Sequence, residues 1–279
     1  MRKHILGVDH AVVVVRDLER AEDTWSRLGF TLTSRGYHTM GSQNHCIMFG
    51  GDYIELLAVP KPHPATRHFT AFLAGGEGLA SIALATDDAR DACDELTAAG
   101  FSPSDPVDFS RPVILPGGAR DASFRISHLP PGSTPGSRTF VCQHFTRDIV
   151  WRPEYVRHPV GATGIAGIAV ISEDVQRTAL AYAKVFGAHP EPIAEGLRVD
   201  TGGAPLAIAS AEQLAARLGE AALPPSRKGA QLAALFLRVG DRSSAVEVLR
   251  RGGFSPTPLA DGSYAIGAQE ANGVALVFG

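Results

Sequence analysis

The stretch VDHAVVVV at residues 8–15 decides the fold. It is short, apolar and rich in β-branched residues, which predicts a buried strand. An Asp-led helix start follows at residues 16–21, and Gly29 stands where a left-handed cap would end that helix. Glycines at 50–51 predict a hairpin turn between the later strands. The unit continues with three short strands, predicted at about 30–36, 44–49 and 53–59.

The same order of strand, acidic residue, helix and glycine occurs four times in the chain. The three later strand starts lie at 78–85, 164–171 and 232–237. The separation is nearly constant, because His10 to Gly29 and Ser81 to Gly100 both span 19 positions. Four such units in register indicate internal duplication of a βαβββ module.

Each module has one helix and several strands, so one face of its sheet stays open. Two modules side by side make a cupped, eight-stranded mixed sheet whose concave face can hold a ligand. We therefore predict an α+β protein with an N-terminal domain at residues 1–160 (modules one and two) and a C-terminal domain at residues 161–279 (modules three and four). Two segments depart from the plain module: a predicted proline-rich loop at 103–118 and the stretch 146–159, which contains Trp151. An added helix is predicted at 211–218 and an exposed linker at 224–228.

Composition limits the classes of function. The 279 residues are 44% hydrophobic and 20% charged with a net charge of −3, which leaves no basic surface for nucleic acid. No apolar run approaches the roughly 20 residues of a membrane span. The first residues lack the apolar region of a signal peptide, and the three cysteines form no pairing motif. We expect a cytoplasmic protein that binds a small molecule, but neither nucleic acid nor a membrane.

The four modules, with DHAV at residues 9–12 and YIEL at residues 53–56, resemble the vicinal oxygen chelate superfamily and, within it, the glyoxalase-like domain proteins. Residues 38–44 and 142–145 are also similar to signatures of that group. The resemblance implies a divalent metal (Zn, Ni, Mn or Fe(II)) in a cupped sheet, held by the first and fourth strands of two paired modules. It leaves open whether modules pair within one chain or across a homodimer.

The resemblance assigns His10 and Glu55 to the two metal-ligand positions of module one. In module two the first-strand position is Ser81, which is not a usual ligand and is assigned to substrate binding. The fourth-strand position is Gln143 or His144, because a one-residue slip in register reverses the face to which a side chain points. His144 is taken as the third metal ligand, and Gln143 as a substrate contact.

The first-strand positions of modules three and four hold Gly167 and Ala234, neither of which can bind a metal. No Glu stands near the matching fourth-strand positions. Among the proteins it resembles, extradiol ring-cleaving dioxygenases keep their iron in this second module pair. Because the ligands are missing there, the resemblance implies that this chain is not such a dioxygenase. The chemistry is predicted to lie in the N-terminal half, which holds nine of the ten histidines.

The residue types themselves support a site at His10 and Glu55. A carboxylate with apolar neighbours on a strand is costly to bury unless it is paired or bound to a metal. His10 then acts either as a metal ligand or as half of a general acid–base pair with Glu55. The alternatives are a hydrogen-bonded histidine of the core and a solvent-facing glutamate.

Four further residues are predicted to contact substrate: His38, Asn44, Trp151 and His158. The first two lie around a glycine-containing turn at the mouth of the sheet. Trp151 either walls the pocket or joins the two halves, and His158 either faces the cavity or belongs to the linker. Two other histidines, His63 and His68, are expected to be exposed in a proline-rich loop.

Two functions follow from these assignments. The first is a metal-dependent lyase, isomerase or hydrolase, with His10 and Glu55 as catalytic residues, that stabilises an oxyanion of a small, oxygen-rich substrate. The second is a small-molecule binder without enzymatic activity, similar to the antibiotic-sequestering, bleomycin-resistance members of the superfamily. Ser81, standing where a ligand is usual, favours the second.

Overall fold

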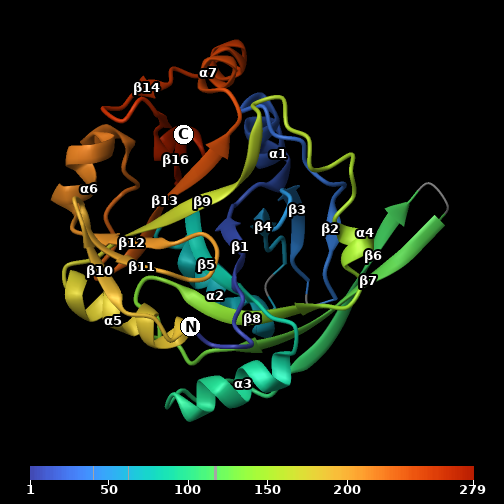
Figure 1. The fold of residues 1–279 in the computed structure, drawn as a ribbon. Coiled ribbons are helices and arrows are strands. Elements are labelled where there is room, and N and C mark those ends of the chain that lie inside the picture. Colours follow the sequence, from blue (N-terminus) through green and yellow to red (C-terminus); the bar gives the residue numbers. More distant parts are fainter. Residues whose placement is uncertain (40, 62, 116–117) are drawn as a thin grey trace.

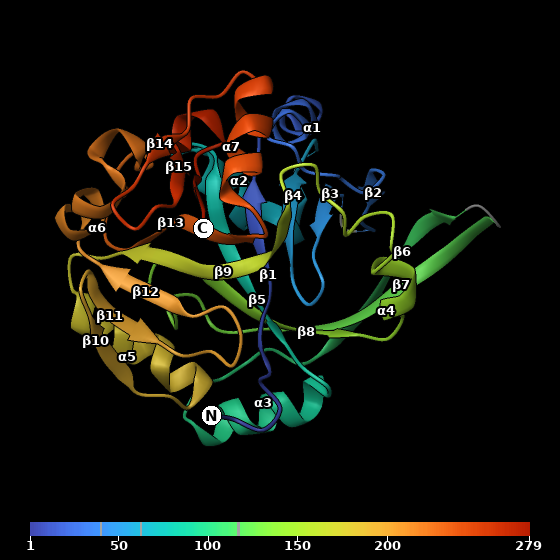
Figure 2. The same ribbon diagram turned by 45° about the horizontal axis from the view of Figure 1, so that its top comes forward.

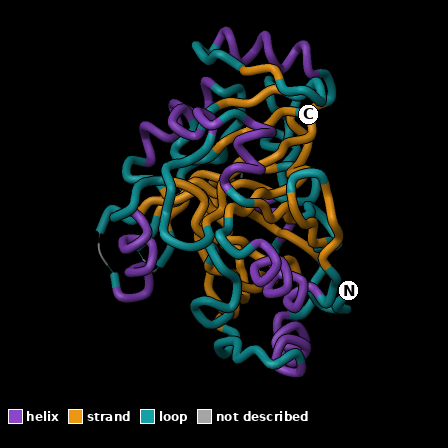
Figure 3. The backbone as a smooth tube through the Cα atoms, turned by 90° about the vertical axis from the view of Figure 1, so that its left-hand side faces the viewer, coloured by secondary structure: helices purple, strands orange, loops and turns teal. Residues whose placement is uncertain are grey.

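The computed structural model describes residues 1–39, 41–61, 63–115 and 118–279. Met40 and Pro116, which belong to two stretches singled out in the sequence, lie outside the described residues. Strands fill the middle of the molecule and helices lie mostly around them (Figures 1 and 3). The strands form two eight-stranded mixed sheets, which confirms the predicted α+β architecture. In the described part of the chain, no helix is long and apolar enough to cross a membrane.

The first sheet contains strands β1 (Gly7–Val14), β2 (Gly36–Tyr37), β3 (Gln43–Met48), β4 (Tyr53–Ala58), β5 (Gly78–Ala85), β6 (Val107–Leu115), β7 (Gly118–His128) and β8 (Arg138–His144). Their order is β2-β3-β4-β1-β5-β8-β7-β6. The central pair, β1 and β5, is antiparallel, and each of the two also pairs with a parallel strand, β4 or β8. Two βαβββ units thus join edge to edge.

The second sheet contains β9 (Ala162–Ile171), β10 (Pro190–Ile193), β11 (Gly196–Val199), β12 (Leu206–Ala209), β13 (Gln231–Val239), β14 (Thr257–Pro258), β15 (Tyr264–Ile266) and β16 (Ala275–Phe278). Their order, β10-β11-β12-β9-β13-β16-β15-β14, is that of the first sheet with every number raised by eight. The two sheets lie side by side in Figure 2.

One helix of each unit follows its first strand: α1 (Leu18–Arg27), α3 (Ala89–Ala98), α5 (Val175–Phe186) and α7 (Arg242–Arg251). Each begins at an aspartate whose carboxylate accepts backbone N–H bonds of the first turn. A glycine with positive φ stands at the end of each: Gly29, Gly100, Gly187 and Gly253. The buried faces of these helices and one face of each sheet form a single continuous core, so the two halves share their hydrophobic interior.

Three expectations for the first half are wrong in detail. Residues 103–118 were expected as a loop, but 107–115 form β6, which extends with β7 beyond the body of the molecule (Figure 2). Its exposed Pro112 is tolerated because β6 is an edge strand. Residues 30–35 are not a strand, and helix α2 (Arg67–Leu73) was not predicted. The added helix α6 (Ala211–Leu218) is confirmed.

Candidate active site

The concave face of the first sheet holds a cavity of about 360 Å³. Its edge strands β2 and β6 contact each other, so the sheet nearly closes on itself. The strands contribute alternate residues to the cavity, as the pleat requires: His10 and Val12 (β1), Asn44 and Cys46 (β3), Tyr53, Glu55 and Leu57 (β4), Val107, Phe109 and Arg111 (β6), Phe124, Ile126 and His128 (β7), and Arg138, Phe140 and Cys142 (β8). Helix α2 and the turn before it line a further side.

An irregularity in β1 orients the side chains of Asp9 and His10. The register of β1 against β5 shifts between Val8 and His10, so Asp9 has no partner residue there. A bulge of this kind re-aims neighbouring side chains. Asp9 Oδ2 accepts a hydrogen bond from His10 Nδ1 at 2.7 Å, and both side chains are almost fully buried. With Nδ1 held by Asp9, Nε2 on the other side of the ring is the His10 nitrogen that can bind a proton or a metal.

Glu55 stands opposite Nε2 of His10. Its Oε2 lies 3.7 Å from His10 Nε2, and its Oε1 accepts a hydrogen bond from Asn44 Nδ2 at 2.6 Å. A carboxylate oxygen and an imidazole lone pair repel each other at this distance unless a cation lies between them. The pair therefore calls for either a proton on His10 or a bound metal.

His38 brings a second imidazole to Glu55. Its Nε2 lies 3.9 Å from Glu55 Oε1, and its Nδ1 forms a 2.8 Å hydrogen bond with the hydroxyl of Ser42. Burial lowers the pKa of His38, against the opposing charge of Glu55, so a neutral ring is favoured at pH 7. Two imidazoles and one carboxylate thus converge at this end of the cavity.

Arg111 adds a buried positive charge to the same region. It is 7% exposed and comes from β6. Within the described residues, its guanidinium makes no ion pair with a carboxylate at 4.0 Å or less. Gly36 on β2 makes room for it, because a Cβ there would lie 3.1 Å from Arg111 Nη1 and collide with Asn44 Oδ1. A buried cation without a carboxylate partner favours an anionic ligand nearby.

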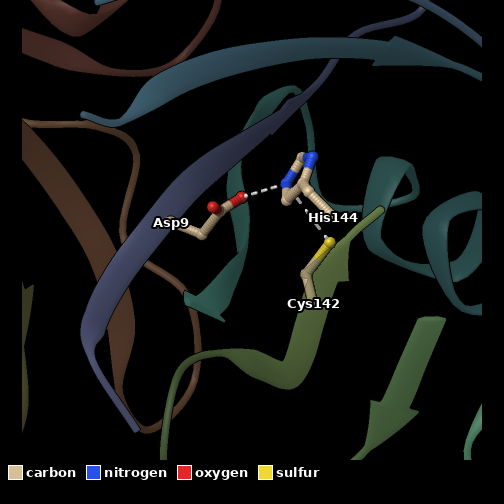
Figure 4. A group of neighbouring side chains, drawn as sticks. All are labelled: Asp9, Cys142 and His144. Atoms are coloured by element: carbon tan, nitrogen blue, oxygen red, sulfur yellow. Dashed lines mark hydrogen bonds and ion pairs between the residues drawn. The ribbon is translucent and has the colours of Figure 1, made fainter. Parts of the chain in front are cut away.

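A second group of polar side chains adjoins the first through Asp9 (Figure 4). His144 Nε2 lies 3.0 Å from Asp9 Oδ2 and 3.6 Å from Cys142 Sγ. One ligand atom from each of these three residues lies within 4.8 Å of the others, a spacing suited to a metal. Burial alone would raise the pKa of Asp9, but the hydrogen bonds from His10 and His144 outweigh it and hold that pKa well below its usual value.

The structure decides between the two neighbouring candidates on β8. Arg138, Phe140 and Cys142 line the cavity, and His144 continues their alternation and reaches Asp9. Gln143 points to the other face, where its amide accepts a hydrogen bond from Ala89 N at 3.1 Å and donates one to Asp87 O at 2.7 Å. It joins β8 to the start of α3, because strand residues alternate between faces.

Three more of the predicted substrate contacts lie outside the cavity. Ser81 is buried on β5 beside Val12. Trp151 donates its indole N–H to Phe49 O at 2.9 Å and packs against the ring of His144. His158 bridges Thr31 N and Met48 O, at 3.0 and 2.9 Å. The latter two connect backbone segments, whereas His38 and Asn44 line the cavity.

Sequence reasoning missed three residues of this site. Asp9 lay within the quoted stretch, but a bulge cannot be seen in a strand pattern. Arg111 was hidden in the segment expected as a loop, although Val107 and Phe109 alternate there with the polar Asp108 and Ser110, as in a strand. His68, expected to be exposed, lines the cavity from the unpredicted helix α2.

The donor set fits a divalent metal. Asp9 holds Nδ1 of His10 and Ser42 holds Nδ1 of His38, so Nε2 of each ring is on the side of Glu55. His38 Nε2 also lies 3.3 Å from Asn44 Nδ2, a contact that a metal at this nitrogen would replace. For His10 the partner is a carboxylate, and fixing the far nitrogen of a metal-binding histidine in this way is a recurrent feature of protein metal sites. Two histidines and one carboxylate with open positions suit Fe(II), and this donor set also accepts Zn, Ni or Mn.

The paired βαβββ units and the cupped first sheet define the chain as a vicinal oxygen chelate fold. Its sequence matches the glyoxalase-like domain family over residues 8–186, and the chain belongs to that family. No curated protein sequence gives a significant match.

Solved structures support the same fold over the whole chain. A hypothetical protein from Staphylococcus aureus is 15% identical with a TM-score of 0.68, and the match covers 98% of each chain. A mutant of 4-hydroxymandelate synthase from Streptomyces coelicolor is 13% identical with a TM-score of 0.62, covering 99% of this chain and 92% of that one. A xylose isomerase-like TIM barrel/4-hydroxyphenylpyruvate dioxygenase fusion protein is 16% identical with a TM-score of 0.61, covering 98% and 49%. At these identities the likeness establishes the fold alone.

Proposed function

We propose that this protein is a divalent-metal-dependent enzyme that acts on a small, oxygen-containing substrate in the cavity of the first sheet, by lyase, isomerase or hydrolase chemistry. One observation carries the proposal. His10 Nε2 faces the Glu55 carboxylate at 3.7 Å, while Asp9 holds the other ring nitrogen. This arrangement is satisfied by a cation between the two side chains.

His10, Glu55 and His38 would hold the metal, and His144 adjoins them through Asp9. When bound, a divalent metal supplies Lewis-acid stabilisation of a negatively charged substrate oxygen. Arg111 adds fixed positive charge to the same side of the cavity. Charge stabilisation by groups already in place is stronger in a site of low dielectric constant than in water.

The remaining walls select the size and polarity of the substrate. Phe109 and Phe124 stack at 5.0 Å between ring centroids, and Tyr53 stacks on His10 at 4.2 Å. These rings exclude water from the polar end and hold the rest of the substrate by apolar contact. Glu55 is then placed to accept a proton from a carbon or oxygen next to the stabilised oxygen.

The test is metal binding by the purified protein. Wild type, stripped with chelator and dialysed against Mn²⁺, Zn²⁺, Ni²⁺ or anaerobic Fe²⁺, is expected to take up one ion per chain, measured by elemental mass spectrometry and calorimetry. His10→Ala and Glu55→Gln should lose this uptake, whereas His189→Ala, a change at an exposed histidine of the second half, should keep it. A wild-type protein that neither carries nor takes up metal would overturn the proposal.

A second candidate function is ligand binding without catalysis. Ser81 in place of a metal ligand and the largely apolar, aromatic lining of the cavity favour it. A binder should show ligand-induced increases in melting temperature that chelator leaves unchanged. Turnover that is lost on chelation and restored by one metal would rule this function out.

A further inference from the structure

A second polar group lies in the same cavity, away from His10 and Glu55. It consists of Arg138 at the start of β8, His128 at the end of β7 and His68 on helix α2. His128 sits beside Phe140 in the ladder of β7 and β8, and its ring centroid is 6.5 Å from that of His68. Two consecutive strands and a helix more than 40 residues before them thus bring one cation and two imidazoles together.

Arg138 has no carboxylate partner among the residues that the structure describes. No carboxylate in the described part of the chain lies within 4.0 Å of its guanidinium, which is half-buried. Burial also lowers the pKa of Arg138, without bringing it near neutrality. A cation taken partly out of water without a counter-charge costs free energy, which a bound anion would recover.

The two imidazoles are neutral hydrogen-bonding groups. Burial, and secondarily the charge of Arg138, lowers the pKa of His128 and that of His68 to about 4. In addition, His128 Nδ1 is buried and has no hydrogen-bond partner among the described residues. A buried polar atom of this kind costs stability unless a ligand or water satisfies it.

Phe140 separates this group from the metal-binding end. Its ring centroid lies 5.5 Å from that of His10 and 5.3 Å from that of His128. It belongs to an apolar cluster with Val12, Leu57 and Phe69. A ligand that touches both polar ends must therefore pass along an apolar wall about one aromatic ring long.

We propose that Arg138, together with His128 and His68, binds the carboxylate of the substrate. The substrate is then a small organic acid with an apolar middle. Its reacting oxygen lies at the other end, beside His10 and Glu55. A single guanidinium fork with neutral imidazoles matches a monoanionic carboxylate. A phosphate dianion would call for a further cation. The position of the reacting end rests on the proposed function, whereas the carboxylate site does not depend on it.

The experiment compares acids with their neutral amides. Phenylacetate, 3-phenylpropionate and hexanoate, each with the corresponding amide, are titrated into the chelator-treated protein by calorimetry. The wild type is expected to bind at least one acid about 10- to 100-fold more tightly than its amide, the size of a charge-assisted hydrogen bond. Arg138→Met should abolish the preference but keep the affinity for the amide, and Arg138→Lys should retain part of it.

Two variants locate the effect. Arg120→Met, at an exposed arginine of β7, should leave the preference unchanged. If Arg111→Met removes the preference and Arg138→Met does not, the carboxylate binds at the metal end and the proposal is wrong. Equal affinity for every acid and its amide, or no acid-selective binding in the series, also overturns it. Circular dichroism confirms that each variant is folded.

Metal uptake is measured separately on the same samples. Arg138→Met should still take up one divalent ion, because Arg138 lies beyond Phe140 from the metal end. If wild type takes up no metal yet distinguishes acid from amide through Arg138, the carboxylate site stands and the proposed enzyme does not. If wild type takes up one metal ion but does not distinguish acid from amide, the proposed enzyme stands and the carboxylate site does not.

Discussion

The two sheets of this protein have the same strand order, but they present different kinds of side chain. The concave face of the first carries two imidazoles beside Glu55, with Arg111 and Arg138 lining the same cavity. The second sheet presents small apolar residues instead, among them Ala169, Ala209, Ala234 and Ala275. A shared topology therefore leaves the chemistry open, and the residues on alternate strand positions decide it.

The segments that follow the fourth strand of each half differ in the same sense. After β4, helix α2 has no buried residue and contributes His68 and Phe69 to the cavity wall. After β12, helix α6 buries Leu214 and Leu218, which join the apolar cluster of the second sheet. One helix thus borders a cavity, and the other packs into the apolar cluster of its sheet.

Charged residues show the contrast again. A pocket of about 290 Å³ at the second sheet is lined by arginines, among them Arg217. That arginine lies 2.7 Å from Glu195 and 3.2 Å from Asp261, so its charge is balanced within the protein. Neither Arg111 nor Arg138 has such a carboxylate in the described ranges. Uncompensated charge in a cavity favours binding of a ligand, whereas paired charge favours a structural role.

The largest effect is expected from Leu214→Ala, which removes a 2% exposed side chain from the interior of the second sheet. Loss of buried leucine should lower the free energy of unfolding by about 2–5 kcal/mol. Metal uptake at the first sheet should remain one ion per chain. Urea unfolding gives the stability change, and a loss below about 1 kcal/mol would show that α6 does not fill this face.

His128 should give the first half a pH dependence that the second lacks. Its pKa is lowered from 6.5 to about 4, so between these values the unfolded chain binds a proton that the folded chain does not. Stability from His128 is therefore full above pH 6.5 and is lost as the pH falls toward 4, by up to about 3 kcal/mol.

Urea unfolding at pH 7 and pH 4.5 measures this dependence. His128→Phe should flatten the fall in stability relative to wild type, while the exposed His189→Asn should follow the wild-type curve. Parallel curves for wild type and His128→Phe would mean that the ring is as easily protonated in the folded protein as in the unfolded chain.

Asp9→Asn should weaken metal binding without removing a ligand. Asp9 fixes the tautomer and orientation of His10, and loss of such a partner typically lowers metal affinity about 10- to 100-fold. Calorimetric titration with Mn²⁺ provides the measurement, with the exposed Asp23→Asn on α1 as control. An affinity unchanged by Asp9→Asn would place the metal away from His10.

The smallest effect is expected from Gln143→Leu, on the face of β8 opposite the cavity. Loss of its hydrogen bonds to Ala89 N and Asp87 O should cost about 1–2 kcal/mol in stability. Affinity for metal and for organic acids should not change. A selective loss of ligand affinity would indicate that this side chain does contact the substrate.

Local signals predicted much of the fold. Each strand, its Asp-capped helix and the closing glycine, as at Asp17 and Gly29, lie close together in sequence and are fixed by local geometry. The pairing of His10 with Glu55 was also predicted, through the resemblance to a known family. Strand β6 was missed because Pro112 within it and the prolines before it favour a loop, although an edge strand tolerates a proline.

By itself, the sequence determined the modules, their order and the half of the chain that carries the histidines, because strand periodicity and helix caps act over a few residues. Only the tertiary structure decided that His144, not Gln143, faces Asp9, since register is set by pairing across the sheet. The same holds for Arg111 and Arg138, neither of which has a carboxylate partner within the described part of the chain. Whether a charge has a partner depends on contacts between segments far apart in the chain, which no local pattern contains.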